Sequence, residues 1–370
     1  MAGWTRGRSS GRTLTVLGAG VAVLMALAAC GGSSDSSAGG GGGGGGGGDN
    51  VEISLITKDS TNPFFVAMQQ SAKKAASDKG IKITIASGKE DGDDQGQIDA
   101  IENAITLQQD GILITPMSTG VNDAIAKARD AGLFVIALDT PTDPPDAVDI
   151  TFATDNREAG NLIGKYAAAK LAGQKAVIAL LDIFDDKVVS VDYNRDQGFL
   201  EGMGLSDIGD PKVNGDEPKT GKYSGGDYEI VGNVATGANE EGGRTGIEQL
   251  LSKNSDINVV YTINEPTAAG ASAALKAAGK SDVVVVSVDG GRAGVEAVKA
   301  GTISATSQQY PSKMVSLGVD AIIKIVKDGT KPENSPGLDF FNTGVTLIAN
   351  DPVDGVESKD AQYGLDNAWG

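Results

Sequence analysis

Residues 51–65 of this 370-residue chain read VEISLITKDSTNPFF, and this stretch decides the fold. Its first seven residues are mostly apolar and rich in β-branched side chains, which predicts a buried β-strand. Residues 60–63 end the strand, because Ser, Thr and Asn favour turns and Pro63 cannot donate to a β-ladder. From Phe64 to Gly80 apolar residues recur at three- and four-residue steps, which predicts a helix. Asn62 and the two phenylalanines are therefore expected at the carboxyl end of a strand, where open α/β sheets bind ligands.

The same alternation of strand and helix continues along the chain. Further strands are predicted at 81–86, 111–115, 134–138, 148–153, 176–181, 228–234, 259–263 and 283–288, with helices at 95–109, 121–131, 159–171, 196–204, 240–251 and 268–278. This order predicts an α/β fold with two doubly wound parallel-sheet lobes and right-handed crossovers. The crossing between lobes is expected near residues 148–157. Residues 205–227 are rich in Gly, Pro, Asp and Lys, which indicates a surface excursion.

Composition limits the possible partners of the chain. It has 49 acidic against 31 basic residues and a formal net charge of −18. An acidic surface repels phosphate backbones, so we expect no nucleic acid partner. The chain contains no histidine. Triads that use histidine and histidine metal sites are therefore excluded, and we expect no enzyme activity, no cofactor and no metal.

The amino-terminal segment indicates export and lipidation. Three arginines precede an apolar run at 14–29 that is too short to be a comfortable membrane span, which predicts a signal peptide over residues 1–29. Cys30, the only cysteine, follows Leu27-Ala28-Ala29, a pattern that resembles the lipobox of bacterial lipoproteins. Residues 31–48 are nearly all Gly or Ser, and coil scaling gives this tether a reach of roughly 20 to 25 Å. We therefore expect a folded part held near a membrane by the lipid on Cys30, on its extracytoplasmic side.

Polar side chains recur where the predicted strands end. Carboxylates, amides and a guanidinium offer paired donors and acceptors of the kind needed to hold sugar hydroxyls. The two adjacent phenylalanines offer flat apolar faces for the C–H face of a sugar ring. The candidate binding residues are Asn62, Phe64, Phe65, Asp139, Arg195, Asn264, Asp289 and Gln309. Five of the polar residues show no obvious helix-capping duty that would occupy them fully: Asp139, Arg195, Asn264, Asp289 and Gln309. Lys58 is expected in solvent rather than in the cleft.

Residues 91–102 nearly match the loop pattern of a calcium site, from Asp91 through Gly96 to Glu102. Isoleucines at helical spacing, however, place Glu102 within a regular helix, and we expect Asp94 to cap that helix instead. A pair such as Asp139 and Asp289 also allows a glycosidase in principle. We expect these carboxylates to stay ionised as hydrogen-bond acceptors.

The local motifs Asn62-Pro63-Phe64-Phe65, Asn264-Glu265 and Ser287-Val288-Asp289-Gly290, with Arg195 and Asp155-Asn156, resemble the ribose-binding cluster of periplasmic sugar-binding proteins of ABC transporters. The resemblance implies two lobes joined by three crossovers, here 51–154 with about 310–342, and 155–309 with about 343–370. It also implies a monomer that binds a monosaccharide in the cleft, sandwiched by Phe64 and Phe65, and delivers it to an ABC permease. A repressor core shares this fold, but no helix-turn-helix precedes Val51.

Two departures from the ribose-binding pattern bear on the substrate. Thr140 stands where the ribose binders have an arginine, and their third stacking aromatic aligns near Ala238. Losing a bidentate donor and an aromatic wall should reshape the pocket. With residues 55–58 (LITK), these features are more similar to fructose-binding members, and we expect fructose or a related hexose. The alternative is a receptor of the same fold for a polyol, a pentose or a signalling molecule.

Overall fold

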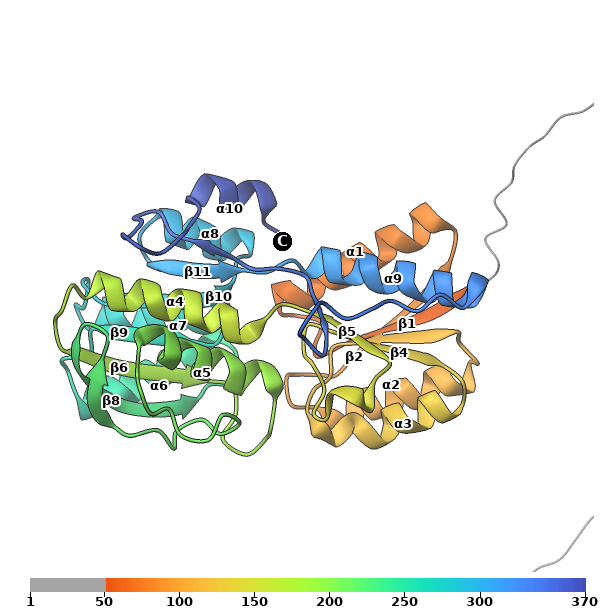
Figure 1. Cartoon of the computed structure of the whole chain (residues 1–370), viewed down its shortest axis with the longest axis horizontal. Helices are drawn as coiled ribbons and strands as arrows, with labels where there is room; N and C mark the ends of the chain where they lie inside the picture. Colours follow the sequence, from red (N-terminus) through yellow and green to blue (C-terminus); the bar gives the residue numbers. More distant parts are fainter. Residues whose placement is uncertain (1–50) are drawn as a thin grey trace, which may run out of the picture. The chain divides into compact units, whose positions relative to one another are not determined.

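A computed structural model describes residues 51–370. The predicted signal peptide, the lipidated Cys30 and the tether lie outside the described residues. The described part contains two β-sheets, each covered by helices, and the chain passes between them three times. The passes run from β5 to α4, from β11 to α9 and from β12 to β13. The predicted α/β fold with parallel-sheet lobes is confirmed (Figure 1).

The first lobe is built on a six-stranded sheet with the order β12-β5-β4-β3-β1-β2, and every pair in it is parallel. Its strands are β1 (Glu52–Thr57), β2 (Lys82–Ser87), β3 (Gly111–Ile114), β4 (Phe134–Leu138), β5 (Ile150–Ala153) and β12 (Phe341–Asn342). Helices α1 (Pro63–Lys79) and α9 (Pro311–Asp328) cover one face, and α2 (Asp94–Thr106) and α3 (Asn122–Asp130) cover the other (Figure 1).

The second lobe is built on a seven-stranded sheet with the order β13-β11-β10-β9-β6-β8-β7. Its strands are β6 (Ala176–Asp182), β7 (Thr220–Tyr223), β8 (Gly226–Ala235), β9 (Val259–Thr262), β10 (Val284–Asp289), β11 (Ala305–Gln308) and β13 (Thr346–Ile348). Its helices are α4 (Asn156–Lys170), α5 (Ser190–Met203), α6 (Glu240–Lys253), α7 (Glu265–Ala277), α8 (Arg292–Lys299) and α10 (Ala361–Asn367). Only the edge strands β13 and β7 pair in the antiparallel sense among these described strands.

Helices α4 and α5 pack with their backbones in contact, and this packing positions a candidate binding residue. A Cβ atom at Gly160 would lie 2.1 Å from the Arg195 carbonyl oxygen, and one at Gly198 would lie 2.1 Å from the Arg157 carbonyl oxygen. Any larger residue would force the helices apart. The close approach sets Arg195 on α5 directly beside Asn156 at the start of α4.

Two local predictions differ from the structure. Helix α5 begins at Ser190, six residues before the predicted start, because its first turns are buried although they carry polar residues. Residues 205–227 are not only a surface excursion, since β7 forms a hairpin with β8 and Tyr223 is buried. Within residues 51–370, no helix is both long enough and apolar enough to span a membrane.

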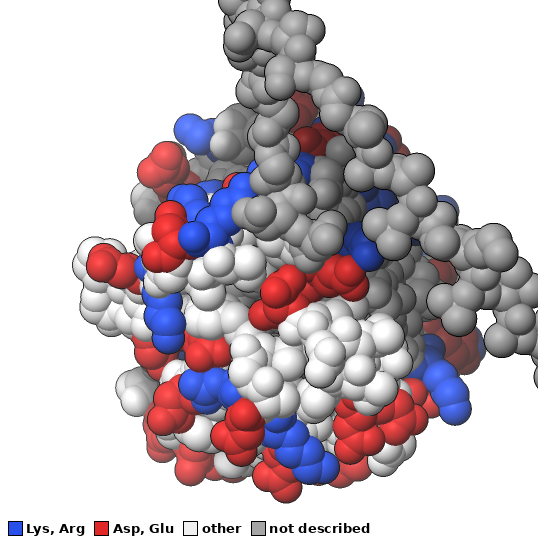
Figure 2. Space-filling model, turned by 90° about the vertical axis from the view of Figure 1, so that its right-hand side faces the viewer, with Lys and Arg blue, Asp and Glu red and all other residues white. Residues whose placement is uncertain are grey.

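Surface charge on the described part is mixed. On the face shown in Figure 2, Lys and Arg side chains lie among Asp and Glu side chains. Exposed ion pairs in the described part include Lys74 with Asp78 and Lys82 with Glu52. Exposed pairs of this kind contribute little to stability.

Candidate functional site

All eight predicted binding residues line one small cavity between the lobes. The other lining residues are Lys58, Asp91, Ile183, Val191, Ala238 and Ile263. Seven of these fourteen residues lie at the carboxyl end of a strand or within two residues of it, and the strands are β1, β4, β6, β9, β10 and β11. The cavity measures about 30 Å³, which is the room that about one water molecule needs. A monosaccharide can therefore enter only after the walls move apart.

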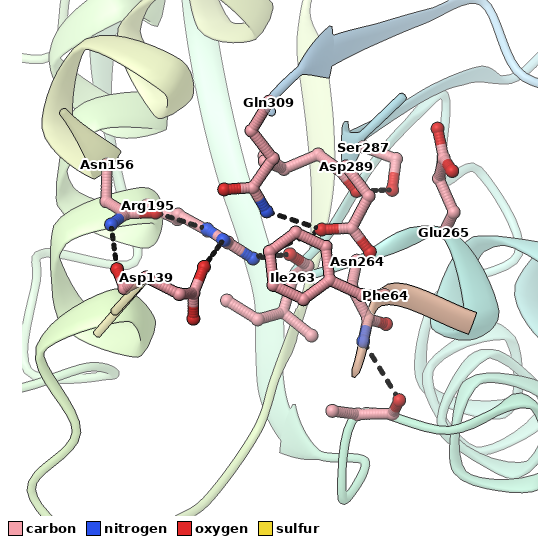
Figure 3. Close-up of polar contacts among 12 residues, drawn as sticks. Phe64, Asp139, Asn156, Arg195, Ile263, Asn264, Glu265, Ser287, Asp289 and Gln309 are labelled. Carbon is pink, nitrogen blue, oxygen red and sulfur yellow. Dashed lines mark hydrogen bonds and ion pairs between the residues drawn. The ribbon is translucent and has the colours of Figure 1, made fainter. Parts of the chain in front are cut away.

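Arg195 lies in the middle of the site, between two carboxylates (Figure 3). Its guanidinium is 3.9 Å from the nearest oxygen of Asp139, in the first lobe, and of Asp289, in the second. Its Nε donates to Asn156 Oδ1 at 2.8 Å, and its Nη1 donates to the Ile263 carbonyl at 2.9 Å. All three charged side chains are at most 6% exposed. One buried cation thus faces two buried anions and couples the lobes.

Asp289 is held by the turn that follows β10. Its backbone φ is 137°, a value that side chains disfavour. The Glu265 carboxylate fastens the next two residues, since Gly290 N and Gly291 N donate to its two oxygens at 2.8 and 2.9 Å. Thr306 also donates to it at 2.8 Å. Burial raises the pKa of Asp289 to about 6, against the opposing effect of the Arg195 charge. Glu265 therefore positions Asp289 from behind.

Replacing Glu265 with Gln should lower the free energy of unfolding by about 1–3 kcal/mol, because an amide NH₂ cannot accept from a buried backbone N–H. Burial raises the pKa of Glu265 to about 8, and the charge of Asp289 acts in the same direction. The unfolded chain loses this proton near the ordinary glutamate pKa of 4.5, whereas the native state keeps it up to a pKa of about 8. The free energy of unfolding therefore falls as pH rises from 4.5 to 8.

The Gln variant lacks this titration. Its free energy of unfolding should therefore fall further below that of the parent at pH 5.5 than at pH 8. Urea unfolding at both pH values measures the difference, with exposed Glu296→Gln as the matched control. A deficit in the free energy of unfolding that is equal at the two pH values would mean that Glu265 is ionised throughout this range.

Three oxygen atoms of the cavity lack a hydrogen-bond partner within the described part of the chain. They are Asp91 Oδ1, Asp139 Oδ1 and Gln309 Oε1. Gln309 uses its amide nitrogen to donate to Asp289 Oδ1 at 2.8 Å, which leaves its oxygen directed elsewhere. A buried acceptor without a donor costs about 1–3 kcal/mol. Hydroxyl groups of a ligand would supply the missing donors.

Asn62 and Asn264 each cap a helix, but neither cap uses all of the hydrogen-bonding capacity of its side chain. Asn62 Oδ1 accepts from Phe64 N at 3.0 Å at the start of α1. Asn264 Oδ1 accepts from Thr267 N at 3.0 Å at the start of α7, and its nitrogen donates to the Ala238 carbonyl. An amide offers two donor hydrogens and two lone pairs, so each cap still leaves bonding capacity for a ligand.

Phe64 and Phe65 are both buried at the cavity wall, but they do not form the predicted sandwich. Their ring centroids are 5.5 Å apart and their planes are inclined by 86°. A sugar held between two rings needs parallel faces with a gap between them, which an edge-to-face pair does not provide. In this arrangement the two rings form one apolar wall.

Lys58 and Asp91 are the charged cavity residues that were not among the predicted binding residues. The prediction that Lys58 is solvated is wrong, since it is only 2% exposed. Burial raises the pKa of Asp91, and the Lys58 charge is the largest effect that opposes this rise. Both residues follow the carboxyl ends of strands, β1 and β2. A search for polar residues just after predicted strands, which identified the other residues, could therefore have identified Lys58 and Asp91 as well.

The calcium-like stretch serves other purposes. Asp93, not Asp94, caps α2, because Asp93 Oδ1 accepts from Gly96 N at 3.1 Å. Glu102 is exposed and forms an ion pair with Lys127 at 3.5 Å. Within residues 51–370, no three His, Cys, Asp or Glu side chains are grouped so that they could hold a metal ion.

The two departures from the ribose-binding pattern have distinct places. Thr140 does not line the cavity; its hydroxyl donates to Asp139 Oδ2 at 2.8 Å and holds that carboxylate. Ala238 does line it, with a left-handed φ of 57°. A methyl group there fills little of the wall.

Comparison with known proteins is consistent with this architecture. The periplasmic binding protein domain matches residues 53–331. The ribose import binding protein of Haemophilus influenzae is 30% identical over 79% of this chain and 90% of its own length. The D-ribose/D-allose-binding protein of Pseudomonas aeruginosa is 26% identical over 80% of this chain and 88% of its own.

Among solved structures, an ABC transporter solute binding protein from Agrobacterium vitis with bound D-fucose superposes with a TM-score of 0.70. It is 26% identical, and the match covers 86% of this chain and all of that one. The domain match spans most of the chain, and both lobes are present in the structure. The chain therefore belongs to the periplasmic binding protein family.

Proposed function

We propose that this chain is an extracytoplasmic substrate-binding lipoprotein that captures a monosaccharide between its lobes and delivers it to an ABC permease. The observation that carries the proposal is the set of unpartnered acceptors on Asp91, Asp139 and Gln309, in a cavity that also contains a guanidinium and an aromatic wall. A polyhydroxylated ring matches these groups, because it donates several hydrogen bonds and presents apolar C–H faces.

Capture requires that the lobes open and close. Asp139 and Phe64 belong to the first lobe, and Arg195, Asn264 and Asp289 to the second, so a ligand contacts both lobes only when they are together. A ligand that binds the closed arrangement better shifts the equilibrium towards it. The closed surface would then be the one that a permease recognises.

Fructose or a related hexose is the proposed ligand. Ala238 leaves the wall small where an aromatic would narrow it, and Thr140 adds no second guanidinium. Lys58 and Asp91 add a donor and an acceptor at the cavity, which suits additional hydroxyls. The named sugars of the relatives, ribose, allose and fucose, belong to those proteins and define the competitors to test.

A thermal-shift panel with D-fructose, D-allose, D-ribose, D-fucose and myo-inositol tests the proposal. A ligand at 100 times its dissociation constant adds about 2.7 kcal/mol to the free energy of unfolding. We expect fructose or another hexose to give the largest rise in melting temperature. Calorimetry with that sugar then measures the affinity. A shift with the polyol or the pentose alone would favour the alternative receptor. No shift with any compound would contradict sugar capture.

Lipid anchoring is a separate part of the proposal, and it rests on the Leu27-Ala28-Ala29-Cys30 pattern. In a bacterial host, the chain should incorporate labelled palmitate and sediment with the membrane. Cys30→Ala should remove the label and release the protein. A Cys30→Ala protein that is still labelled would show that lipid is attached elsewhere or not through this pattern.

A further inference from the structure

Trp369 links the second lobe to the first. It follows α10, which packs against α8 and β13 of the second lobe. Its own carbonyl accepts from Arg292 N at 3.0 Å, at the start of α8. Its indole ring, in contrast, packs against the apolar core of the first lobe. The tail of one lobe therefore reaches across to the core of the other.

Two proposed binding residues rest directly on Trp369. The Trp369 and Phe64 rings meet edge to face, with centroids 5.2 Å apart and planes inclined by 83°. The Trp369 Nε1 donates to the Gln309 carbonyl at 3.1 Å. Trp369 itself does not line the cavity. It thus lies behind Phe64 and Gln309, and any ligand would contact it only through them.

Trp369 is half-buried: it packs against neighbouring residues and also lines a separate cavity of about 760 Å³. A Cβ atom at Gly291 would lie 3.1 Å from the indole ring, so the turn after Asp289 also closes on it. Phe64 is 3% exposed and is held on two sides, by Phe65 and by Trp369. Removing the indole would free one side of Phe64 and the backbone of Gln309 together.

We infer that Trp369 is a positioning residue that straps the second lobe to Phe64 and favours the closed arrangement. This inference rests on the proposed function, because it concerns the affinity of the same cavity. Opening of the lobes must either break the contact between the two rings or pull the tail away from α8. The strap should therefore slow the release of bound sugar more than it affects the encounter.

The test compares Trp369→Ala and Trp369→Phe in the full chain, with the sugar that gives the largest shift in the panel. Trp369→Ala should weaken binding about tenfold, mainly through faster dissociation, since an aromatic pair and a hydrogen bond are lost. Trp369→Phe keeps an aromatic edge but lacks the N–H donor. Its affinity should therefore lie between those of the parent and of Trp369→Ala. Gln362→Ala, at an exposed position of α10, is the matched control and should bind as the parent does.

A double-mutant cycle separates positioning from general destabilisation. In a Phe64→Ala background, Trp369→Ala should add little to the loss of affinity, because its partner is already absent. A Trp369→Ala protein that binds within twofold of the parent would overturn the inference. So would effects of the two substitutions that simply add.

Fluorescence gives a readout that needs no sugar. Trp4 and Trp369 are the two tryptophans of the chain, so Trp4→Phe leaves Trp369 as the only emitter. Phe64→Ala should then make Trp369 more accessible to acrylamide, and unchanged quenching would contradict the strap. If the parent protein binds no sugar, the proposed function fails, while this quenching result still decides whether the ring is held against Phe64.

Discussion

Replacing Arg195 with Met should abolish detectable sugar binding and lower the free energy of unfolding by about 3–5 kcal/mol, because it leaves buried charges without a partner. Asp139 and Asp289 both face the guanidinium at 3.9 Å. Without it, the two carboxylates repel each other in a buried site, and Asn156 Oδ1 and the Ile263 carbonyl lose their donors. Urea unfolding and calorimetry measure the two effects.

Two further variants make the Arg195 result interpretable. Arg195→Lys keeps the charge but cannot reproduce the separate bonds to Asn156 and Ile263, so it should fold and bind weakly. Arg157→Met removes an arginine whose ion pair with Glu201 is at the surface, and it should keep near-parental stability and affinity. An Arg195→Lys protein with parental affinity would exclude Arg195 from the binding site.

Replacing Asp139 with Asn should weaken sugar binding about 10- to 100-fold, because one charged acceptor becomes neutral and one oxygen becomes a donor. Asp139 Oδ1 is buried and has no hydrogen-bond partner among the described residues, so it is available to accept from a ligand hydroxyl. Asn is the informative substitution. Asp139 has a left-handed φ of 65°, which Asn tolerates and Ala does not.

Calorimetry with the best sugar of the panel measures the Asp139 effect. The matched control is Asp320→Asn on α9, an exposed carboxylate paired with Lys79 at 2.7 Å, which should leave affinity unchanged. If Asp139→Asn bound within twofold of the parent, the unpartnered oxygen would not be a ligand acceptor. A thermal scan without sugar checks that the variant is folded.

Capture by closure makes Arg195 and Trp369 complementary. Arg195 joins the lobes within the cavity through charge, and Trp369 joins them behind Phe64 through apolar contact. The electrostatic attraction between Arg195 and the two aspartates holds the lobes together strongly, but only while both carboxylates are ionised. The raised pKa of Asp289, about 6, means that its charge is lost on mild acidification. The aromatic contact does not titrate.

The sequence was sufficient for the fold because the relevant signals are local. The strand, the turn and the start of the helix in residues 51–65 each follow from side chains within a few positions. The repetition of this strand–helix unit along the chain predicts lobes built on parallel β-sheets. Parallel strands end at the same edge of a sheet, so polar residues after them must gather there. For this reason the sequence by itself predicts one shared site for six polar residues: Asn62, Asp139, Arg195, Asn264, Asp289 and Gln309.

Only the tertiary structure shows how deeply these residues are buried, how they are oriented and which of their polar atoms are already hydrogen-bonded. Burial of Lys58 depends on walls from both lobes, and no local pattern reports a distant wall, so a lysine is predicted to be solvated. The orientation of Phe64 is set by Trp369, which lies at the opposite end of the described chain. Periodicity tells which side of a strand or helix is apolar, whereas partners at long range decide which buried polar atoms are satisfied and which remain for a ligand.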